Sequence, residues 1–516
     1  MAKLLAHFFA FSLFMAFRIA TSEPILISCR QTPYPHVCSS MVSSSPLFAQ
    51  AKTQSGFRHL ALQAAIDRAI RAHELASTMD VSSLDERVKA AWADCLELCE
   101  DTIGKLNRSM SSSSYDDAQT WLSAAMANQQ TCRNGFLELD SSFPLGSSPF
   151  MSYNISESLS NLLAINMATT PAMSGGNRRL LSDGFPNWLS ATDRKLLRSS
   201  TINADLVVAK DGSGDYKTIS EAIAAAMKQS SGKSRFVIHV KTGVYDENVQ
   251  TSMKNLMIIG DGMDATVVTG SKNVKDGSTT FRSATFAVTG DGFIARDMTF
   301  ENTAGPQKQQ AVALRSGSDL SVFYQCSFKG YQDTLYVYSQ RQFYRNCDIY
   351  GTVDFIFGDA AVVLQNCNMH VRKPMSGQKN TVTAQGRTDP NENTGISIHD
   401  SAVTAASDLK PVQGSFETYL GRPWQEYSRT VFMKTSLDSL IDPAGWLEWS
   451  GNFALSTLYY GEYMNTGPGA DTSQRVKWPG YHVITSAAEA SKFTVGNFLS
   501  GNSWIPATEV PFTSGL

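Results

Sequence analysis

The segment 323–369 decides the fold, because one short pattern occurs in it three times. It reads FYQCSFKG at 323–330, FYRNCDIYG at 343–351 and LQNCNM at 364–369. The cysteines of the three copies, Cys326, Cys347 and Cys367, are separated by 21 and then by 20 residues. A period near 20 residues, in strand-like runs without helical segments between them, is typical of stacked coils. The repeat therefore predicts a right-handed parallel β-helix.

The same texture continues on both sides of the repeat. Runs such as FVIHV at 236–240 and LMIIG at 256–260 are punctuated by glycine, asparagine and aspartate. Short β-branched and aromatic runs between such residues are typical of strands joined by tight turns. We predict that residues 201–516 form one all-β domain.

The residues before this domain have a different pattern. From 25 to 173 the chain is rich in alanine and leucine, and apolar side chains recur every three or four residues, as at Val88, Ala91, Trp92, Cys95 and Leu98. This spacing places apolar side chains on one face of a helix. We predict an N-terminal all-α helical bundle, with loops at the serine-rich stretches 111–114 and 141–148.

Residues 1–22 are predicted to be a secretion signal. The apolar run from Leu4 to Phe17 follows Lys3, and its length of about 14 residues is short of the roughly 20 that span a bilayer. We therefore expect a secreted, extracellular protein without a membrane anchor. Export makes the sequons at Asn107 and Asn154 candidate glycan acceptors and allows disulfides to persist.

A polar linker is predicted between the two domains, at 174–200. It carries two similar tetrads, RRLL from Arg178 and Arg179 and RKLL from Arg194 and Lys195. Basic pairs at a domain boundary of a secreted protein indicate proteolytic processing. The alternative is that these are solvated charges beside a hydrophobic docking strip.

The charge balance limits the partners. The 516 residues include 44 lysines and arginines and 47 aspartates and glutamates, for a net charge of −3. Such a chain has no global field that would attract nucleic acid or anionic lipid. A polyanionic substrate would have to be bound by local charges.

The register of the repeat points to a pair of carboxylates. Asp333 and Asp354 each follow a repeat cysteine by seven residues, so they should project from neighbouring coils about 4.8 Å apart. Two carboxyl groups that close do not both ionise readily, which divides them into a proton donor and a nucleophile. Aspartates that only stabilise turns are the structural alternative.

Five motifs around this pair resemble the plant pectin methylesterase (pectinesterase) family. They are GVYDE at 243–247, QAVAL at 310–314, YQDTL at 331–335, DFIFG at 354–358 and LGRPW at 420–424. The helical part resembles the pectin methylesterase inhibitor family. The resemblance implies an enzyme preceded by an inhibitor-like pro-region, and its substrate would be methyl-esterified pectin.

The resemblance also implies roles for single residues. Asp354 would be the nucleophile, Asp333 the acid and then the base, and Gln310 and Gln332 the donors to the oxyanion. Arg422 would hold Asp354 ionised, Trp424 would offer a flat face to a sugar ring, and Thr280 would contact substrate. Gln310 could instead belong to a structural ladder, Arg422 to a structural ion pair, and Trp424 to the core.

The resemblance further implies disulfides from Cys29 to Cys38 and from Cys95 to Cys132. For the stacked cysteines, the coil spacing allows either Cys326 or Cys367 to pair with Cys347. The resemblance favours Cys347 with Cys367. Histidines and cysteines show no metal-ligand spacing, so no metal or other cofactor is expected.

The sequence lacks the signatures of several other functions. A lyase would need acidic Ca²⁺ clusters with a basic proton abstractor, a polygalacturonase would need inverting carboxylates, and no Gly-x-Ser-x-Gly elbow of a serine esterase is present. A binding protein whose β-helix is inactive is the alternative from another class. Besides pectin in the cell wall, the expected partners are separate pectinesterase inhibitor proteins and a subtilisin-like processing protease.

Overall fold

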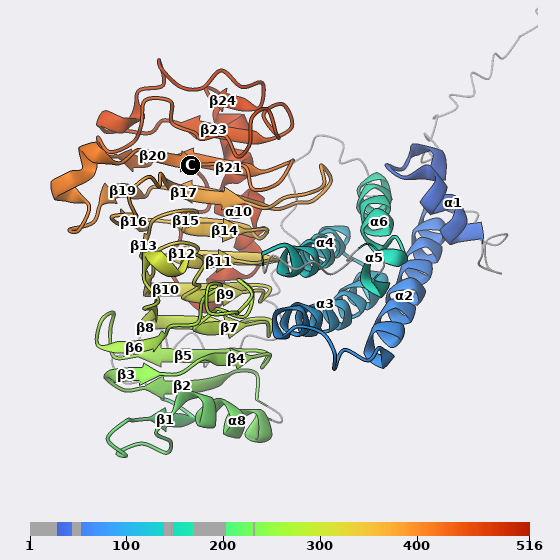
Figure 1. Cartoon of the computed structure of the whole chain (residues 1–516), viewed down its shortest axis with the longest axis horizontal. Helices are drawn as coiled ribbons and strands as arrows, with labels where there is room; N and C mark the ends of the chain where they lie inside the picture. Colours follow the sequence, from blue (N-terminus) through green and yellow to red (C-terminus); the bar gives the residue numbers. More distant parts are fainter. Residues whose placement is uncertain (1–27, 44–52, 139–145, 147, 170–202, 231–232) are drawn as a thin grey trace, which may run out of the picture.

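A computed structural model describes residues 28–43, 53–138, 146, 148–169, 203–230 and 233–516. The predicted secretion signal and the predicted linker with its basic tetrads lie outside these ranges. None of the helices within them combines the length and the hydrophobicity needed to cross a membrane. The two-part fold predicted from the sequence, a helical domain followed by a parallel β-helix, is confirmed (Figure 1).

The helical domain consists of long helices joined by short connections. Its helices are α1 (Pro35–Ser43), α2 (Gln54–Thr78), α3 (Glu86–Ser111), α4 (Tyr115–Glu138), α5 (Pro149–Ser152) and α6 (Ile155–Thr169), after the 3₁₀ turn η1 (Cys29–Gln31). Thr53 and Asp85 accept hydrogen bonds from backbone N–H groups in the first turns of α2 and α3, which caps these helices. The serine-rich stretch 111–114 separates α3 from α4 as predicted, and the apolar stripe of α3 is buried.

Two disulfides join elements of the helical domain. Cys29 is bonded to Cys38, and Cys95 in α3 is bonded to Cys132 in α4. Cys99 is a buried free thiol. The two candidate glycan acceptors, Asn107 and Asn154, are exposed, and their glycosylation stays a prediction.

The β-helix contains two sheets of parallel strands. The smaller sheet consists of β4 (Val249–Thr251), β7 (Phe286–Val288), β9 (Leu314–Ser316), β11 (Leu335–Val337), β14 (Ile356–Gly358), β17 (Asn380–Gln385) and β20 (Thr418–Gly421). The larger sheet consists of β1 (Leu206–Val208), β2 (Phe236–Val240), β3 (Gly243–Asp246), β5 (Leu256–Gly260), β6 (Thr266–Gly270), β8 (Ile294–Asn302), β10 (Ser321–Lys329), β12 (Arg341–Arg345), β13 (Asp348–Gly351), β15 (Ala361–Gln365), β16 (Asn368–Val371), β18 (Gly395–His399), β19 (Ala402–Ala405), β21 (Arg429–Met433), β22 (Ser436–Leu437), β23 (Tyr459–Tyr463) and β24 (Tyr481–Val483).

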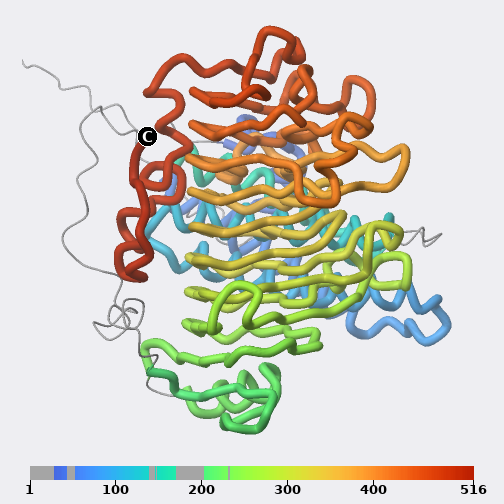
Figure 2. The backbone as a smooth tube through the Cα atoms, turned by 90° about the vertical axis from the view of Figure 1, so that its left-hand side faces the viewer, coloured from blue at the N-terminus to red at the C-terminus, as the bar shows by residue number. Residues whose placement is uncertain are grey.

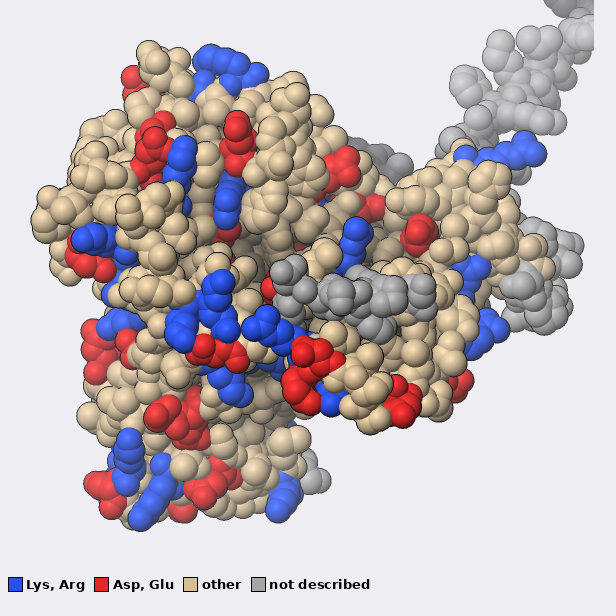
Figure 3. All heavy atoms as spheres, viewed as in Figure 1, with Lys and Arg blue, Asp and Glu red and all other residues tan. Residues whose placement is uncertain are grey.

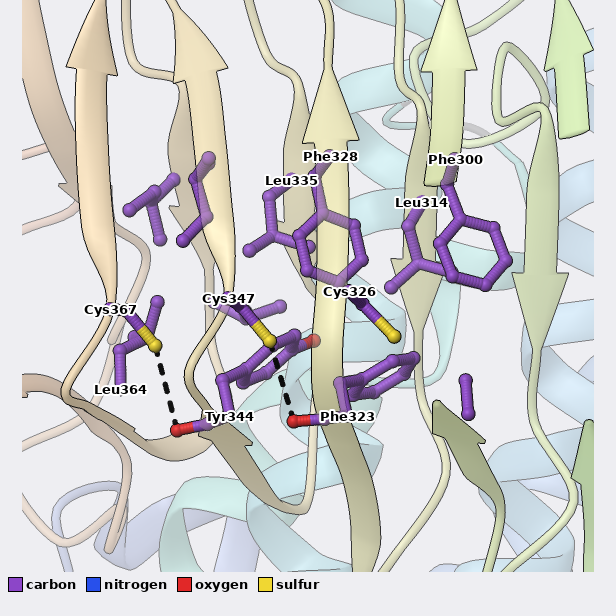
Figure 4. Close-up of a cluster of buried hydrophobic side chains, with 14 of the residues drawn as sticks. Phe300, Leu314, Phe323, Cys326, Phe328, Leu335, Tyr344, Cys347, Leu364 and Cys367 are labelled. Atoms are coloured by element: carbon purple, nitrogen blue, oxygen red, sulfur yellow. Dashed lines mark hydrogen bonds between the residues drawn. The ribbon is translucent and has the colours of Figure 1, made fainter. Parts of the chain in front are cut away.

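The register between coils follows the sequence repeat. Ser327 pairs with Asp348, and Asp348 pairs with Asn368, so the three preceding cysteines are stacked (Figure 4). The residue before each cysteine has a positive φ, at 51° for Gln325, 53° for Asn346 and 54° for Asn366. Asparagine tolerates this left-handed region better than most residues. Each copy of the repeat therefore contains a backbone bend at the residue before the cysteine and a buried side chain at the cysteine itself.

The expected disulfide between Cys347 and Cys367 is not formed. Both are buried free thiols, as is Cys326. The thiol of Cys347 lies 3.4 Å from the carbonyl oxygen of Phe323, and that of Cys367 lies 3.7 Å from the carbonyl oxygen of Tyr344 (Figure 4). Stacked side chains project in parallel, whereas a disulfide needs Cβ atoms that converge with a dihedral near 90°. A distance between coils that allows a disulfide was therefore not sufficient to predict that one forms.

Helices that the sequence did not predict cover the β-helix. The helix α8 (Ile219–Gln229) lies at its N-terminal end, and a C-terminal segment runs along its side (Figures 1 and 2). That segment contains α9 (Ala487–Ala490), α10 (Val495–Phe498) and the 3₁₀ turns η7 (Ser491–Phe493), η8 (Gly501–Ser503) and η9 (Ile505–Thr508). Further 3₁₀ turns are η4 (Pro306–Lys308), η5 (Lys410–Ser415) and η6 (Pro468–Ala470). Trp504 and Val495 bury the outer apolar side chains of the larger sheet, such as Val363.

The helical domain packs against the smaller sheet, where α3 and α4 lie nearest the β-helix (Figure 1). One apolar cluster includes Phe136 of α4 together with Tyr336 and Phe357 of the sheet. Polar contacts cross the same junction, including a hydrogen bond of 2.6 Å from Tyr338 Oη to Asn128 Oδ1. The outer face of the smaller sheet is therefore covered by the helical domain.

Candidate active site

The two aspartates singled out by the repeat lie on neighbouring coils. Asp333 and Asp354 each stand two residues before a strand of the smaller sheet, and Leu335 of β11 pairs with Ile356 of β14. The backbone N–H of Asp333 donates a hydrogen bond of 3.1 Å to the carbonyl oxygen of Val353. Their φ angles are 61° and 51°, in the left-handed region that aspartate tolerates. The stacking predicted from the 21-residue spacing is thus present.

A cavity of about 360 Å³ contains this pair. It is lined by every residue to which the family resemblance gave a catalytic or substrate-binding role: Thr280, Gln310, Gln332, Asp333, Asp354, Arg422 and Trp424. Its other lining residues are Asn134, Leu137, Glu138, Phe357, Ala384 and Trp449. The fold therefore brings together residues that are far apart in the chain.

Asp354 is held in one orientation by two side chains. Arg422 donates from Nε to Oδ1 at 2.8 Å and from Nη2 to Oδ2 at 2.6 Å. Thr381 Oγ1 donates to Oδ1 at 2.6 Å and accepts from the backbone N–H of Asp354 at 2.8 Å. Burial is the largest single influence and lowers the pKa of Arg422, but the charge and hydrogen bonds of Asp354 together with the charge of Asp333 raise it overall. A bidentate guanidinium fixes the direction of a carboxylate as well as its charge.

Asp333 is in a different electrostatic environment. It is 7% exposed, and its pKa is raised well above the usual range, first by burial and then by the neighbouring charges of Asp354 and Glu138. Arg422 opposes this rise but does not cancel it. A carboxyl group with a raised pKa keeps its proton near neutral pH and can serve as a general acid.

Three buried polar atoms of residues in the cavity wall make no hydrogen bond within the described part of the chain. They are Thr280 Oγ1, Gln310 Oε1 and Asn134 Nδ2. Leaving a buried polar atom unpaired is costly. Unpaired polar atoms that line a cavity are suited to bind a ligand that enters it.

Aromatic rings form another part of the wall. Trp424 and Phe357 meet edge to face with their ring centroids 5.8 Å apart. A Cβ atom at Gly386 would lie 2.8 Å from Trp424 Cε3, so only glycine leaves room for the indole there. The guanidinium of Arg422 stands 4.4 Å from the ring centroid of Trp449. Flat apolar faces beside polar groups are suited to bind sugar rings.

The end of α4 closes the cavity from the other side. Asn134, Leu137 and Glu138 belong to the helical domain and line the same cavity as Asp333. Glu138 Oε2 accepts a hydrogen bond of 3.1 Å from the backbone N–H of Thr280. Burial raises the pKa of Glu138 to about 7, against the hydrogen bonding from Thr280 and with a further contribution from Asp94. The helical domain thus occupies the approach to the two aspartates.

Several of these residues give no signal in the sequence that would place them at the site. Thr381 lies 27 residues after Asp354, so the period of 20 or 21 did not reach it. Trp449 stands outside the five motifs and carried no local signal. Glu138 belongs to the other domain, and only the docking of that domain brings it to the cavity.

The geometry supports acyl transfer. A fixed carboxylate beside a protonated carboxyl group, with amides close by, can attack an ester carbonyl and protonate the leaving alcohol. Among the described residues, no three His, Cys, Asp or Glu side chains gather in a way that would hold a metal ion.

Comparisons with known proteins agree with this chemistry. The family model described as pectinesterase matches residues 205–502, and the one described as plant invertase/pectin methylesterase inhibitor matches residues 25–165. Pectinesterase 2 of Citrus sinensis is 57% identical over 96% of this chain and 95% of its own length. The solved structure of carrot pectin methylesterase is 64% identical, with a TM-score of 0.60, over 62% of this chain and 100% of its own. The Aspergillus niger enzyme is 31% identical, with a TM-score of 0.52, over 60% of this chain and 97% of its own.

Proposed function

Because this chain belongs to the pectinesterase family and therefore hydrolyses methyl esters of pectin, we propose that Asp354 and Asp333 carry out the reaction as an aspartyl esterase. The substrate group is the C6 methyl ester of a galacturonic acid unit. The products are methanol and the free carboxyl group of a galacturonic acid unit, which then loses its proton to water.

In the first step, a carboxylate oxygen of Asp354 attacks the ester carbonyl carbon. The amides of Gln310 and Gln332 donate hydrogen bonds to the oxyanion that forms. Asp333 transfers its proton to the methoxy oxygen, the C–O bond to that oxygen breaks, and methanol leaves. The galacturonate acyl group is then bound to Asp354 as an anhydride.

In the second step, ionised Asp333 takes a proton from a water molecule. The resulting hydroxide attacks the galacturonate carbonyl carbon, and the bond to Asp354 breaks. Asp354 is released as a carboxylate, and Asp333 again carries the proton for the next cycle. The same residue thus acts first as acid and then as base.

The observation that carries this assignment is the contrast between the two aspartates in one cavity. Asp354 is bound by the fork of Arg422, whereas the pKa of Asp333 is raised well above the usual range. Carboxyl groups whose environments differ in this way take the roles of nucleophile and acid. A structural pair of turn aspartates would need neither the arginine fork nor the adjoining amides.

The test uses the β-helical part alone, residues 198–516. The solved carrot enzyme corresponds in length to this part, which indicates that the part folds without the helical domain. Asp354→Asn cannot form the anhydride and Asp333→Asn cannot donate the proton, so each should lower methanol release by about 10³-fold or more. Asp348→Asn, on the outer surface of the next coil, is the matched control. Near-normal release by a folded Asp354→Asn protein would overturn the assignment and favour a binding protein with an inactive β-helix.

We further infer that the chain is made in a latent form and acts outside the cell. The helical domain covers the aspartates, and the linker 174–200 with its two basic tetrads connects it to the β-helix. Secretion through residues 1–22 and cleavage by a subtilisin-like protease would release the active part into the cell wall. Separate inhibitor proteins would be able to bind the cleft thus exposed.

Changing Arg178, Arg179, Arg194 and Lys195 to Ala tests the processing. The secreted protein should then keep the mass of the helical domain and should release little methanol. An unchanged mature mass would contradict cleavage at these tetrads.

A further inference from the structure

Two arginines of the β-helix lie under the helical domain, outside the catalytic machinery. Arg282 follows the cavity residue Thr280 by two positions. Its Nε donates to Asp94 Oδ1 at 2.5 Å, and its Nη2 donates to Glu97. Both carboxylates belong to α3. Figure 3 shows acidic side chains of the helical domain next to basic side chains of the β-helix along this junction.

The second arginine is Arg315 on β9. It is 1% exposed, and its Cζ lies 3.4 Å from the ring centroid of Phe281. Its Nε and Nη1 make no hydrogen bond within the described part of the chain. Asp94 and Glu97 act on it electrostatically. A buried cation without a bonded partner is costly unless opposite charge is near, and here that charge comes from the helical domain.

The position of these arginines connects them to the cleft. Arg315 pairs with Tyr336 across the smaller sheet, and Tyr336 pairs with Phe357, which lines the cavity. Tyr336 is three residues beyond Asp333, so Arg315 lies about 10 Å along the strand direction from the reacting group. This distance is too long for contact with the reacting ester and is suited to a neighbouring unit of the same polymer.

Another arginine at the junction provides a contrast. Arg341 bonds Asp117 of α4, but it also bonds Asp319 of the β-helix at 2.8 Å. Within the described residues, the other side chain that Arg282 hydrogen-bonds is the neutral Gln250. Release of the helical domain therefore leaves Arg341 paired with a carboxylate and leaves Arg282 without one. Arg282 then resembles an empty anion site more than a structural ion pair.

We propose that Arg282, backed by Arg315 behind Phe281, is a subsite of the cleft that binds the free carboxylate of a de-esterified galacturonate unit. In the intact chain, Asp94 and Glu97 occupy this subsite in place of the substrate carboxylate. A guanidinium binds a carboxylate through two parallel hydrogen bonds, and a methyl ester offers no such charge. The inference rests on the proposed function of the adjoining cavity.

The test is inhibition of the isolated β-helix, residues 198–516, by fully de-esterified oligogalacturonate. Methanol release from methyl-esterified pectin gives the inhibition constant. Arg282→Gln should raise this constant about tenfold or more, because a charge-assisted hydrogen bond to a carboxylate is lost. Arg282→Lys should raise it less, because the charge remains without the fork. Arg296→Gln, on β8 of the larger sheet, is the matched control and should leave the constant unchanged.

The outcomes separate the two proposals. If the parent β-helix releases methanol but Arg282→Gln and Arg282→Lys are inhibited like the parent, the carboxylate subsite is wrong. If the folded parent releases no methanol, the failure lies with the proposed function instead. Should Arg282→Gln not fold, the parent itself gives a measurement, since inhibition through an exposed ion pair must weaken with added salt. Inhibition that is independent of salt would also overturn the subsite.

Discussion

The helical domain should leave the active site more readily as the pH rises, through Glu138. The pKa of Glu138 is about 7 in the docked chain, against an ordinary value of 4.5. The docked state therefore binds more protons than the released state between these values, and docking is favoured at acid pH. The carboxyl groups of Asp333 and Asp94 lie near Glu138, so an ionised Glu138 would stand in a buried, acidic environment.

The magnitude follows from the two pKa values. They differ by about 2.5, and each pKa unit corresponds to 1.36 kcal/mol, so docking weakens by at most ~3.4 kcal/mol as the pH rises through these two values. This change corresponds to about a 300-fold rise in the ratio of released to docked chains.

The assay compares an uncleavable full chain, with the four basic tetrad residues changed to Ala, with the isolated β-helix. The ratio of their rates of methanol release, measured from pH 5 to 8, cancels the titration of the catalytic aspartates. We expect the ratio to rise with pH in the wild-type chain. Glu138→Gln should keep the ratio low and nearly constant, because the amide accepts the hydrogen bond from Thr280 without ionising. The exposed Glu100→Gln is the matched control and should behave as wild type. A flat wild-type ratio, or an unchanged slope in Glu138→Gln, would refute the reasoning.

Three further predictions concern the β-helix. Denaturation of the isolated β-helix should expose three free thiols, Cys326, Cys347 and Cys367, that are protected in the native protein, as the structure describes; a titration that finds one would mean that a disulfide, such as Cys347 to Cys367, forms after all. Thr381→Val removes a hydrogen bond to Asp354, so kcat/KM should fall about tenfold or more in a folded protein; a value within twofold of wild type would make Thr381 dispensable. From Arg198 onward there are 28 basic and 30 acidic residues, so Trp424→Ala should weaken binding of fully methyl-esterified pectin more than added salt does, as measured by KM.

Much of the fold could be predicted because residues at the same position in each sequence repeat occupy the same position on successive coils of the β-helix. Equal spacing from the repeat cysteines placed Asp333 and Asp354 on neighbouring coils, and the pairing of β11 with β14 has that register. A fixed spacing of 20 or 21 residues no longer predicts which residues pair where a coil is longer. Ile356 pairs with Thr383, 27 residues later, and for that reason Thr381 could not be found beside Asp354.

The features that could not be predicted depend on how side chains are oriented or on how separate segments pack against the β-helix. The coil spacing allowed a disulfide between Cys347 and either neighbouring cysteine, and the family resemblance favoured Cys367, but all three thiols are free in the structure. The C-terminal segment around Trp504 has no repeat, so its place along the larger sheet had no signal. Glu138 reaches the cavity only because the helical domain buries its apolar face against Tyr336 and Phe357.

The junction between the domains combines two kinds of contact with opposite dependence on charge. Asp94 and Glu97 form ion pairs with the guanidinium of Arg282 and so help to hold the domain. Glu138 is buried beside the acidic groups Asp333 and Asp94, and its docked position is favoured while it carries a proton. A rise in pH therefore weakens one end of the junction and leaves the other intact. The covalent connection keeps the helical domain at a high effective concentration, so a pH rise alone should loosen the inhibitor-like domain, whereas cleavage of the linker lets dilution complete its release.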